Sequence, residues 1–289
     1  MKEEQNHFIK NIEIKNFKCF ENFSAEGFGR VNLIGGKNNV GKTAFMEACY
    51  LANKETRQKR LKQIIKNRYL IDIFTDLYAE IGTQYINNFL EKEKTKYTID
   101  INIDIKTNEM LFKSSNKVSD KVFDLLYGTI IDNELEQKLD TILYNFDKNI
   151  SKFRIKEGKA HCQSNGTFYH INELGEGLSQ YTAFIILLLT HKNAILFIDE
   201  IENGIHYTNL DKLWKIILTI SKEQNVQVFA TTHSKECIES YARVAKKLED
   251  EEIGFIELGR NKKNELDAIV MDSEMFQRFI KLGNEVRGW

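Results

Sequence analysis

The sequence predicts an α/β fold in which a mostly parallel central sheet is flanked by helices. Three continuous apolar runs, at residues 31–34, 194–198 and 226–230, are typical of strands buried on both faces of a parallel sheet. Between the second and third runs, apolar residues recur at the spacing of one face of an amphipathic helix: Leu210, Leu213, Trp214, Ile217 and Leu218. These segments form a β-α-β unit, in which the two strands are parallel.

Antiparallel β structure is predicted near both ends of the chain. Residues 9–23 alternate between apolar and polar side chains enough to predict a short antiparallel strand or hairpin ahead of the first apolar run. Residues 253–258 and 268–271 predict a second hairpin, joined through the turn-forming sequence Gly-Arg-Asn-Lys. An antiparallel β subdomain is therefore expected beside the parallel sheet.

A stretch of different character interrupts this core. Between about residues 51 and 154 the sequence predicts long charged helices, with strand-like segments at 97–105 and 110–113. We interpret this stretch as a mainly helical insertion or lid. The predicted domain organisation is an N-terminal part of the core at 1–50, the insertion at 51–154, and a C-terminal part of the core at 155–289.

The segment after the first apolar run reads G-K-N-N-V-G-K-T, a complete G-x-x-x-x-G-K-T phosphate loop leading into a helix-like stretch. Its glycines let backbone N–H groups turn inward around the β- and γ-phosphates, and Lys42 reaches the same oxygens as a point charge. The Thr43 hydroxyl is positioned to ligate Mg²⁺. An ordinary glycine-rich turn is the alternative. The residues predicted to bind a nucleoside triphosphate are Gly36, Asn38, Asn39, Val40, Gly41, Lys42, Thr43 and Ala44.

Two acids follow the second apolar run, in the sequence I-L-F-I-D-E at residues 195–200. This pattern describes a buried strand whose carboxyl end emerges at the rim of the sheet, where open α/β folds place their ligands. Asp199 is predicted to hold Mg²⁺. Glu200 is predicted to take a proton from the water that attacks the γ-phosphate. The alternative is a pair of acids that only solvates a strand end.

The third apolar run also ends in polar residues, in the sequence V-F-A-T-T-H-S at residues 228–234. His233 lies 34 positions beyond Asp199, a separation that one helix and one neighbouring strand would occupy. A lone histidine is more often structural than functional. The strand context favours a catalytic role, in which His233 reaches the γ-phosphate as a sensor or hydrogen-bond donor.

A second glycine turn precedes an apolar helix predicted at about 179–190. The sequence E-L-G-E-G-L-S-Q at residues 173–180 places bare backbone N–H groups and a positive helix-dipole end where an anion could bind. Because the phosphate loop already occupies one end of the nucleotide, this turn is predicted to serve a nucleotide bound by another subunit, through Gly175, Gly177 and Ser179. The alternative is a tight turn into a buried helix.

The net charge and the lengths of the apolar runs indicate which partners the protein can bind and where it is located. The net charge of −1 provides no global attraction for nucleic acid, so such contact requires a local patch. One basic cluster exists and forms either a solvated helix face or a contact for nucleic acid or an acidic partner. The longest apolar run, residues 183–189, is far short of the ~20 residues of a membrane helix, and the N-terminus has no signal region, so we expect a cytoplasmic protein with no membrane partner. The cluster is centred on Arg57, Lys59, Arg60 and Lys62.

The order of motifs resembles the ABC-type ATPase heads and, more narrowly, the bacterial AAA-family ATPases related to OLD (overcoming lysogenization defect) and SMC-like DNA-repair proteins. The matching elements are FIKNIEIKNFKCF, the Walker A loop GKNNVGKT, the signature-like ELGEGLSQ, the Walker B strand ILFIDEIENGIH, the switch segment VFATTHS and the terminal EVRGW. The turn departs from the transporter signature LSGGQ, and Tyr207 stands where many relatives have proline. The nuclease domain of full OLD proteins is expected to be lacking.

The resemblance implies an enzyme that hydrolyses ATP to ADP and phosphate with Mg²⁺. Two copies would sandwich two ATP molecules, so that ATP favours a homodimer and hydrolysis releases it. The expected setting is nucleic-acid processing or antiphage defence with a separately encoded effector. Two alternatives remain open. The departure from LSGGQ and the insertion disfavour the ATPase subunit of a membrane transporter, and the Asp199–Glu200 pair disfavours a nucleotide-binding scaffold without turnover.

Overall fold

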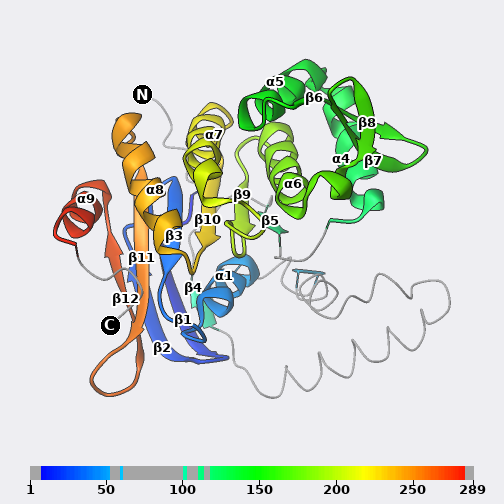
Figure 1. Cartoon of the computed structure of the whole chain (residues 1–289). Helices are drawn as coiled ribbons and strands as arrows, with labels where there is room; N and C mark the ends of the chain where they lie inside the picture. Colours follow the sequence, from blue (N-terminus) through cyan, green and yellow to red (C-terminus); the bar gives the residue numbers. More distant parts are fainter. Residues whose placement is uncertain (1–7, 53–58, 61–99, 103–109, 114–117, 284–289) are drawn as a thin grey trace, which may run out of the picture.

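The computed structural model describes residues 8–52, 59–60, 100–102, 110–113 and 118–283. Its centre is a six-stranded sheet of order β12-β11-β3-β10-β9-β5, in which every neighbouring pair is parallel except the edge pair β11–β12 (Figure 1). The strands are β3 (Val31–Gly35), β5 (Met110–Lys113), β9 (Ile195–Ile198), β10 (Gln227–Thr231), β11 (Ile253–Arg260) and β12 (Leu266–Met271). The predicted mostly parallel sheet is confirmed.

The central strands divide their side chains between two hydrophobic cores. In β9, Leu196 and Ile198 enter one cluster of buried residues, whereas Ile195 and Phe197 enter the other. This division follows from the two-residue period of a strand, which sends successive side chains to opposite faces. Both faces are covered, so the strand needs no polar positions and appears in the sequence as a continuous apolar run.

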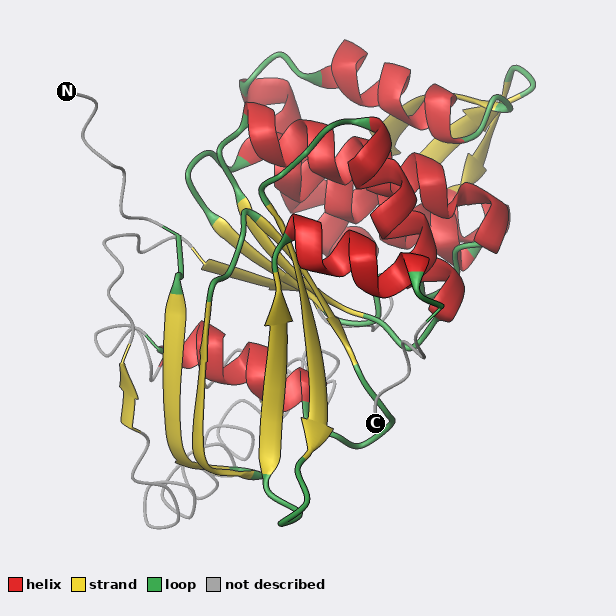
Figure 2. Ribbon diagram, turned by 90° about the vertical axis from the view of Figure 1, so that its left-hand side faces the viewer, coloured by secondary structure: helices red, strands yellow, loops and turns green. Residues whose placement is uncertain are grey.

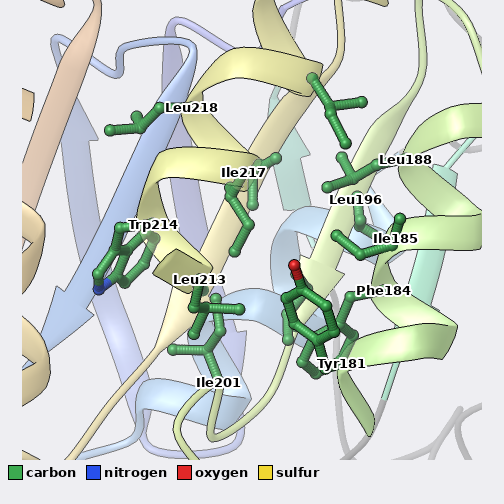
Figure 3. Packing of buried hydrophobic residues seen from close by; sticks show 14 of the residues in the cluster. Tyr181, Phe184, Ile185, Leu188, Leu196, Ile201, Leu213, Trp214, Ile217 and Leu218 are labelled. Carbon is green, nitrogen blue, oxygen red and sulfur yellow. The ribbon is translucent and has the colours of Figure 1, made fainter. Parts of the chain in front are cut away.

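Helices cover the first face of the sheet. Figure 3 shows α6 and α7 directing apolar side chains toward each other and toward β9, with Tyr181 and Leu213 among them. Trp214 is fully buried, and its indole N–H donates to the carbonyl oxygen of Cys237 at 3.1 Å, which ties α7 to α8. The helices of this face are α6 (Glu176–Thr190), α7 (Leu210–Glu223), α8 (Lys235–Lys247) and α9 (Ser273–Lys281).

The opposite face carries α1 (Lys42–Leu51) and a three-stranded antiparallel sheet of order β2-β1-β4. Figure 2 shows the strands and helices of the molecule from the side. The antiparallel structure predicted near both chain ends is confirmed, because β1 pairs with β2 and β11 pairs with β12, both antiparallel. The turn of the second hairpin begins later than predicted, because Gly259 and Arg260 belong to β11. The strands of the small sheet are β1 (Asn11–Phe17), β2 (Phe20–Glu26) and β4 (Asp100–Asn102).

A mixed subdomain between β5 and β9 packs on α6. Ser119 begins its first helix, because the Ser119 side chain accepts a hydrogen bond from the backbone N of Val122. The ring of Phe146 stacks on Tyr181 of α6 with centroids 3.7 Å apart. Its elements are α4 (Asp120–Asp132), α5 (Glu136–Phe146), an antiparallel sheet of β6 (Ile150–Lys156), β7 (Lys159–Ser164) and β8 (Thr167–His170), and the 3-10 helix η2 (Ile171–Leu174).

Two strands inside the predicted insertion belong to the sheets of the core. β4 pairs with β1 in the small antiparallel sheet, and β5 pairs in parallel with β9 at the edge of the central sheet. The insertion is therefore not a separate body from residue 51 to residue 154. The chain returns to both sheets before it enters α4, which places the end of β5 beside the end of β9.

Candidate active site

The carboxyl ends of β3, β9 and β10 bring the three predicted motifs to one edge of the central sheet. These strands are neighbours and parallel, so the polar residues that follow them emerge together. Backbone bonds fix the arrangement, because the N–H of Thr232 donates to the Ile34 carbonyl at 3.1 Å and the N–H of Ile201 donates to the Thr231 carbonyl at 3.0 Å. The site is thus a product of the strand order.

The phosphate loop closes around the Lys42 side chain. The ammonium of Lys42 donates to the carbonyl oxygens of Gly36 at 2.8 Å and Lys37 at 2.9 Å. Gly41 precedes α1 with φ of 96°, and no side chain caps the helix there. The first N–H groups of α1 are therefore available to an anion, which the helix dipole also favours.

Other residues of the loop differ in how they can contribute. Asn38 and Asn39 are exposed, so both residues are accessible to a ligand. The side chains of Val40 and Ala44 are buried in the core behind α1, which leaves only their backbone groups for a ligand. Gly36 is buried under the loop with φ of 135°.

Burial shifts the pKa of Lys42. Its side chain is almost completely covered, and this burial lowers the pKa from 10.5 to about 8. The negative charges of Glu202, Asp199 and Glu200 act in the opposite direction and raise it. Three acids therefore face this one cation, and a bound triphosphate would add further negative charge beside it.

The oxygen atoms of Thr43, Asp199 and Thr231 meet at the edge of the sheet. The Thr43 hydroxyl donates to the two carboxylate oxygens of Asp199 at 3.2 and 3.3 Å. The Thr231 hydroxyl donates to Asp199 Oδ1 at 2.7 Å. Hydroxyl and carboxylate oxygens are the ligands that Mg²⁺ accepts in nucleotide sites. The donor set therefore fits the cation that the phosphate loop implies.

Glu200 and His233 face each other across the same edge. His233 Nε2 lies 3.7 Å from Glu200 Oε1, and both side chains are more than a third exposed. Glu200 has φ of 52°, a left-handed conformation that costs a non-glycine residue about 1–3 kcal/mol and that is concentrated at functional sites. Its backbone N–H donates to the Thr231 hydroxyl at 2.8 Å, which holds the residue in that conformation.

The second glycine turn is only partly open to solvent. Gly175 and Glu176 are exposed, but Gly177 and Ser179 are buried. Gly177 lies against the backbone of Gly204, so closely that a Cβ added at Gly177 would come within 1.9 Å of the Gly204 carbonyl oxygen. Of the residues predicted to bind a second copy's nucleotide, Gly175 is exposed, whereas Gly177 and Ser179 are buried, and their role stays a prediction.

The predicted basic cluster also needs correction at one member. Arg60 is buried, with Nη1 donating to the Tyr50 carbonyl at 3.0 Å and the guanidinium 5.3 Å from the Tyr50 ring centroid. A buried arginine in this packing cannot contact nucleic acid. Lys59 is exposed. Arg57 and Lys62 lie outside the described residues.

Three residues at the site were missed by the sequence analysis. Thr231 contacts Asp199 and Glu200, as described above. Glu202 accepts a hydrogen bond from the backbone N–H of His233 at 2.8 Å. Lys113 ends β5, and its carbonyl accepts from the Asp199 N–H at 3.0 Å. Burial lowers the Lys113 pKa to about 8, while the charges of Asp199 and Glu176 raise it.

The fold and this site define an ATPase of the ABC type. The family described as "AAA domain, putative AbiEii toxin, Type IV TA system" matches residues 55–239, more than half of the chain, and the chain belongs to that family. The ATP/GTP phosphatase of Helicobacter pylori is 24% identical over 327 aligned residues, which cover 80% of this chain and 86% of that protein. The DNA replication and repair protein RecF of Clostridium botulinum is 26% identical over 165 residues, which cover 56% of this chain and 41% of RecF.

Solved structures share the fold at low sequence identity. An SMC head bound to the C-winged helix domain of ScpA matches with a TM-score of 0.59 at 12% identity, over 95% of this chain and 99% of that chain. The protein cbiO1 of Clostridium perfringens, part of the ABC transporter complex cbiONQ, matches with a TM-score of 0.51 at 11% identity, over 95% and 92% of the two chains. Within the described residues, no helix combines the length and apolarity needed to cross a bilayer.

Proposed function

We propose that the protein hydrolyses ATP to ADP and phosphate at the edge formed by β3, β9 and β10, and that ATP binding controls its dimerisation. One observation carries this proposal. Thr43 and Asp199 lie within hydrogen-bond distance of each other, and the acid Glu200 and His233 stand beside them. Phosphate loop, cation ligands and a base are thereby gathered at one place, as phosphoryl transfer to water requires.

The phosphate loop would bind the triphosphate. Backbone N–H groups of Gly36 to Ala44 and the first turn of α1 would surround the β- and γ-phosphates, and Lys42 would exchange its two carbonyl partners for phosphate oxygens. Thr43 and Asp199 would hold Mg²⁺, which supplies positive charge against the developing charge on the phosphates. The burial of Lys42 strengthens its attraction to an anion, because little water remains to screen it.

Glu200 and His233 would act on the reacting atoms. Glu200 would accept the proton of a water molecule whose oxygen forms a bond to the γ-phosphorus, while the bond from that phosphorus to the bridging oxygen of ADP breaks. His233 would donate a hydrogen bond to a γ-phosphate oxygen as its charge develops. Both side chains are more than a third exposed, so a bound nucleotide could reach them from the solvent side.

Dimerisation would come from the exposed edge of the second glycine turn. Gly175 and Glu176 begin α6 at the surface, and no atom of the described residues lies within 4 Å of where a Cβ at Gly175 would stand. Free N–H groups at the start of α6 could bind the triphosphate held by a second copy. A ligand that binds only the paired state shifts the association equilibrium by mass action, so hydrolysis would release the dimer.

The biological setting is proposed from the relatives. RecF is by name a DNA replication and repair protein, and the family description names a toxin–antitoxin system, which has two components. The name of RecF supports a role in nucleic-acid processing, and the family description supports a separately encoded effector. The OLD-like alternative, antiphage defence, is proposed on the resemblance of the motifs alone. Within the described residues, Lys59 is the exposed member of the basic cluster, and it would contact the nucleic acid.

A phosphate-release assay tests the enzymatic proposal. The wild-type protein with Mg²⁺ is expected to release phosphate from ATP, and Lys42→Ala is expected to lower kcat/KM by on the order of 10²–10³. GTP as a second substrate shows whether the activity extends to both bases, as the name of the Helicobacter pylori relative suggests. Phosphate release that is absent with both nucleotides, or unchanged in Lys42→Ala, contradicts the proposal.

A further inference from the structure

Glu202 lies two residues after Glu200 in the segment ILFIDEIENGIH, and no role has been assigned to it above. One of its carboxylate oxygens, Oε1, accepts a hydrogen bond from the backbone N–H of His233 at 2.8 Å. The other, Oε2, is buried and has no hydrogen-bond partner among the described residues. A buried carboxylate oxygen without a hydrogen bond destabilises the folded state, so its presence calls for a functional reason.

The backbone around Glu202 is held firmly on both sides. The N–H of Ile201 donates to the Thr231 carbonyl at 3.0 Å, and the N–H of Ile205 donates to the Glu202 carbonyl at 2.9 Å. The turn that contains Glu202 is therefore fixed to the end of β10. Its side chain reaches across to the next residues of the same strand end, where the chain leaves β10 for α8.

Hydrogen bonds hold the chain at His233 and on both sides of it. Its backbone N–H is bound by Glu202, its ring nitrogen lies 3.7 Å from Glu200, and the next residue, Ser234, caps α8 by accepting from the Cys237 N–H at 3.1 Å. On the preceding side, the Thr232 N–H donates to the Ile34 carbonyl, and the Thr232 hydroxyl accepts from the Ser234 N–H at 3.1 Å. Among these anchors, Glu202 is the one that binds the main chain of His233 itself.

We infer that Glu202 is a positioning residue, whose carboxylate holds the main chain of His233 so that the imidazole stands opposite Glu200 at the reacting phosphate. The inference rests on the proposed function, because it concerns the same active site. The negative charge of Glu202 also acts on Lys42. An experiment must therefore separate the effect of this charge from the effect of the hydrogen bond to His233. An amide oxygen can accept the same hydrogen bond, whereas a side chain shorter by one methylene cannot reach it.

Two conservative variants separate these effects. Glu202→Gln keeps the reach and an acceptor oxygen but removes the charge, and it is expected to retain kcat within about threefold of wild type. Glu202→Asp keeps the charge but withdraws the acceptor, and it is expected to lower kcat by roughly tenfold or more, because small misplacements of catalytic groups are that costly. The KM for ATP is expected to change little in both, since His233 acts after ATP is bound.

The measurement is steady-state phosphate release, with Glu26→Ala as a control that removes an exposed carboxylate at the end of β2, outside the three motifs of the site. The ¹H–¹⁵N resonance of the His233 amide provides a second reading, expected to move in Glu202→Asp and to stay near its wild-type position in Glu202→Gln. The reverse order of activities, or equal activity of all variants, overturns the inference. A wild-type protein that releases no phosphate would instead contradict the proposed function.

Discussion

The phosphate site and the second glycine turn differ in how much of each a single chain completes. At the phosphate site, Thr43, Asp199 and Thr231 already contact one another, and Lys42 is enclosed by the loop. At the turn, only Gly175 and its neighbour are open, while Gly177 is buried against Gly204. The parallel strands of one chain bring the residues of the phosphate site together. The exposed turn would form a complete site only with the nucleotide of a second copy.

The largest expected effect is the loss of ATP hydrolysis when the proposed base of the phosphate site, Glu200, is replaced. Glu200→Gln is expected to lower kcat by about 10²–10⁴, because the amide cannot accept the proton of the attacking water. ATP binding is expected to persist, since Lys42 and the loop are untouched. Phosphate release and fluorescent-nucleotide titration measure the two quantities, and Glu26→Ala serves as the control. Hydrolysis at the wild-type rate in Glu200→Gln would remove Glu200 from the mechanism.

A pH titration of ATP binding tests the enclosure of Lys42. With its pKa lowered to about 8, Lys42 is charged at pH 7 and loses its proton as the pH rises through 8. The triphosphate favours the charged form and raises this pKa, so binding takes up a proton and weakens as the pH rises. The Kd is expected to increase about tenfold between pH 7 and pH 9. Lys42→Arg, which stays charged, is expected to flatten the profile, and an equally steep profile in Lys42→Arg speaks against this cause.

A smaller effect is expected at the glycine turn. Gly177→Ala forces a methyl group into the backbone of Gly204, which is expected to lower the free energy of unfolding by about 1–3 kcal/mol. Gly128→Ala, in an open position on α4, is expected to raise it by roughly 0.5–1 kcal/mol. Urea unfolding measures both. The affinity of Gly177→Ala for ATP should stay at the wild-type value, and loss of that affinity would show that the turn belongs to the phosphate site of its own chain.

The smallest effect on the fold is expected at the basic cluster. Lys59→Glu is expected to change the free energy of unfolding by less than about 0.5 kcal/mol, because the side chain is exposed. If this cluster binds nucleic acid, the same change removes any stimulation of ATP hydrolysis by DNA. Lys152→Glu on β6 alters the net charge equally at another exposed position. Equal loss of stimulation in both variants would point to general charge and not to this cluster.

The sequence predicts the parts of the site that are contiguous and tied to strands. The phosphate loop, the acids after β9 and the histidine after β10 each follow a buried apolar run, and such runs are readable because both sheet faces are covered. Parallel neighbours then bring those ends together. The separation of His233 from Asp199 predicted that the strands before these two residues are neighbours, and the parallel pairing of β9 with β10 confirms it. The position of β3 on the other side of β10 left no signal in the sequence.

Other features left too little trace in the sequence. β5 is four residues long and joins a partner strand more than 80 positions away, so its membership of the sheet could not be predicted from periodicity. Arg60 occurs among cations that suggest a solvated helix, yet it packs on Tyr50. Glu202 could have been noticed two residues after Glu200, but its hydrogen bond to His233 depends on how the turn folds back.

Light scattering of Glu200→Gln at micromolar protein, with Mg²⁺ and with or without ATP, tests the central claim most directly. The proposed switch predicts a monomer mass without nucleotide and a doubling of that mass with ATP, because this variant is expected to bind ATP without consuming it. An unchanged mass under conditions in which nucleotide titration shows the site to be filled would contradict ATP-dependent dimerisation.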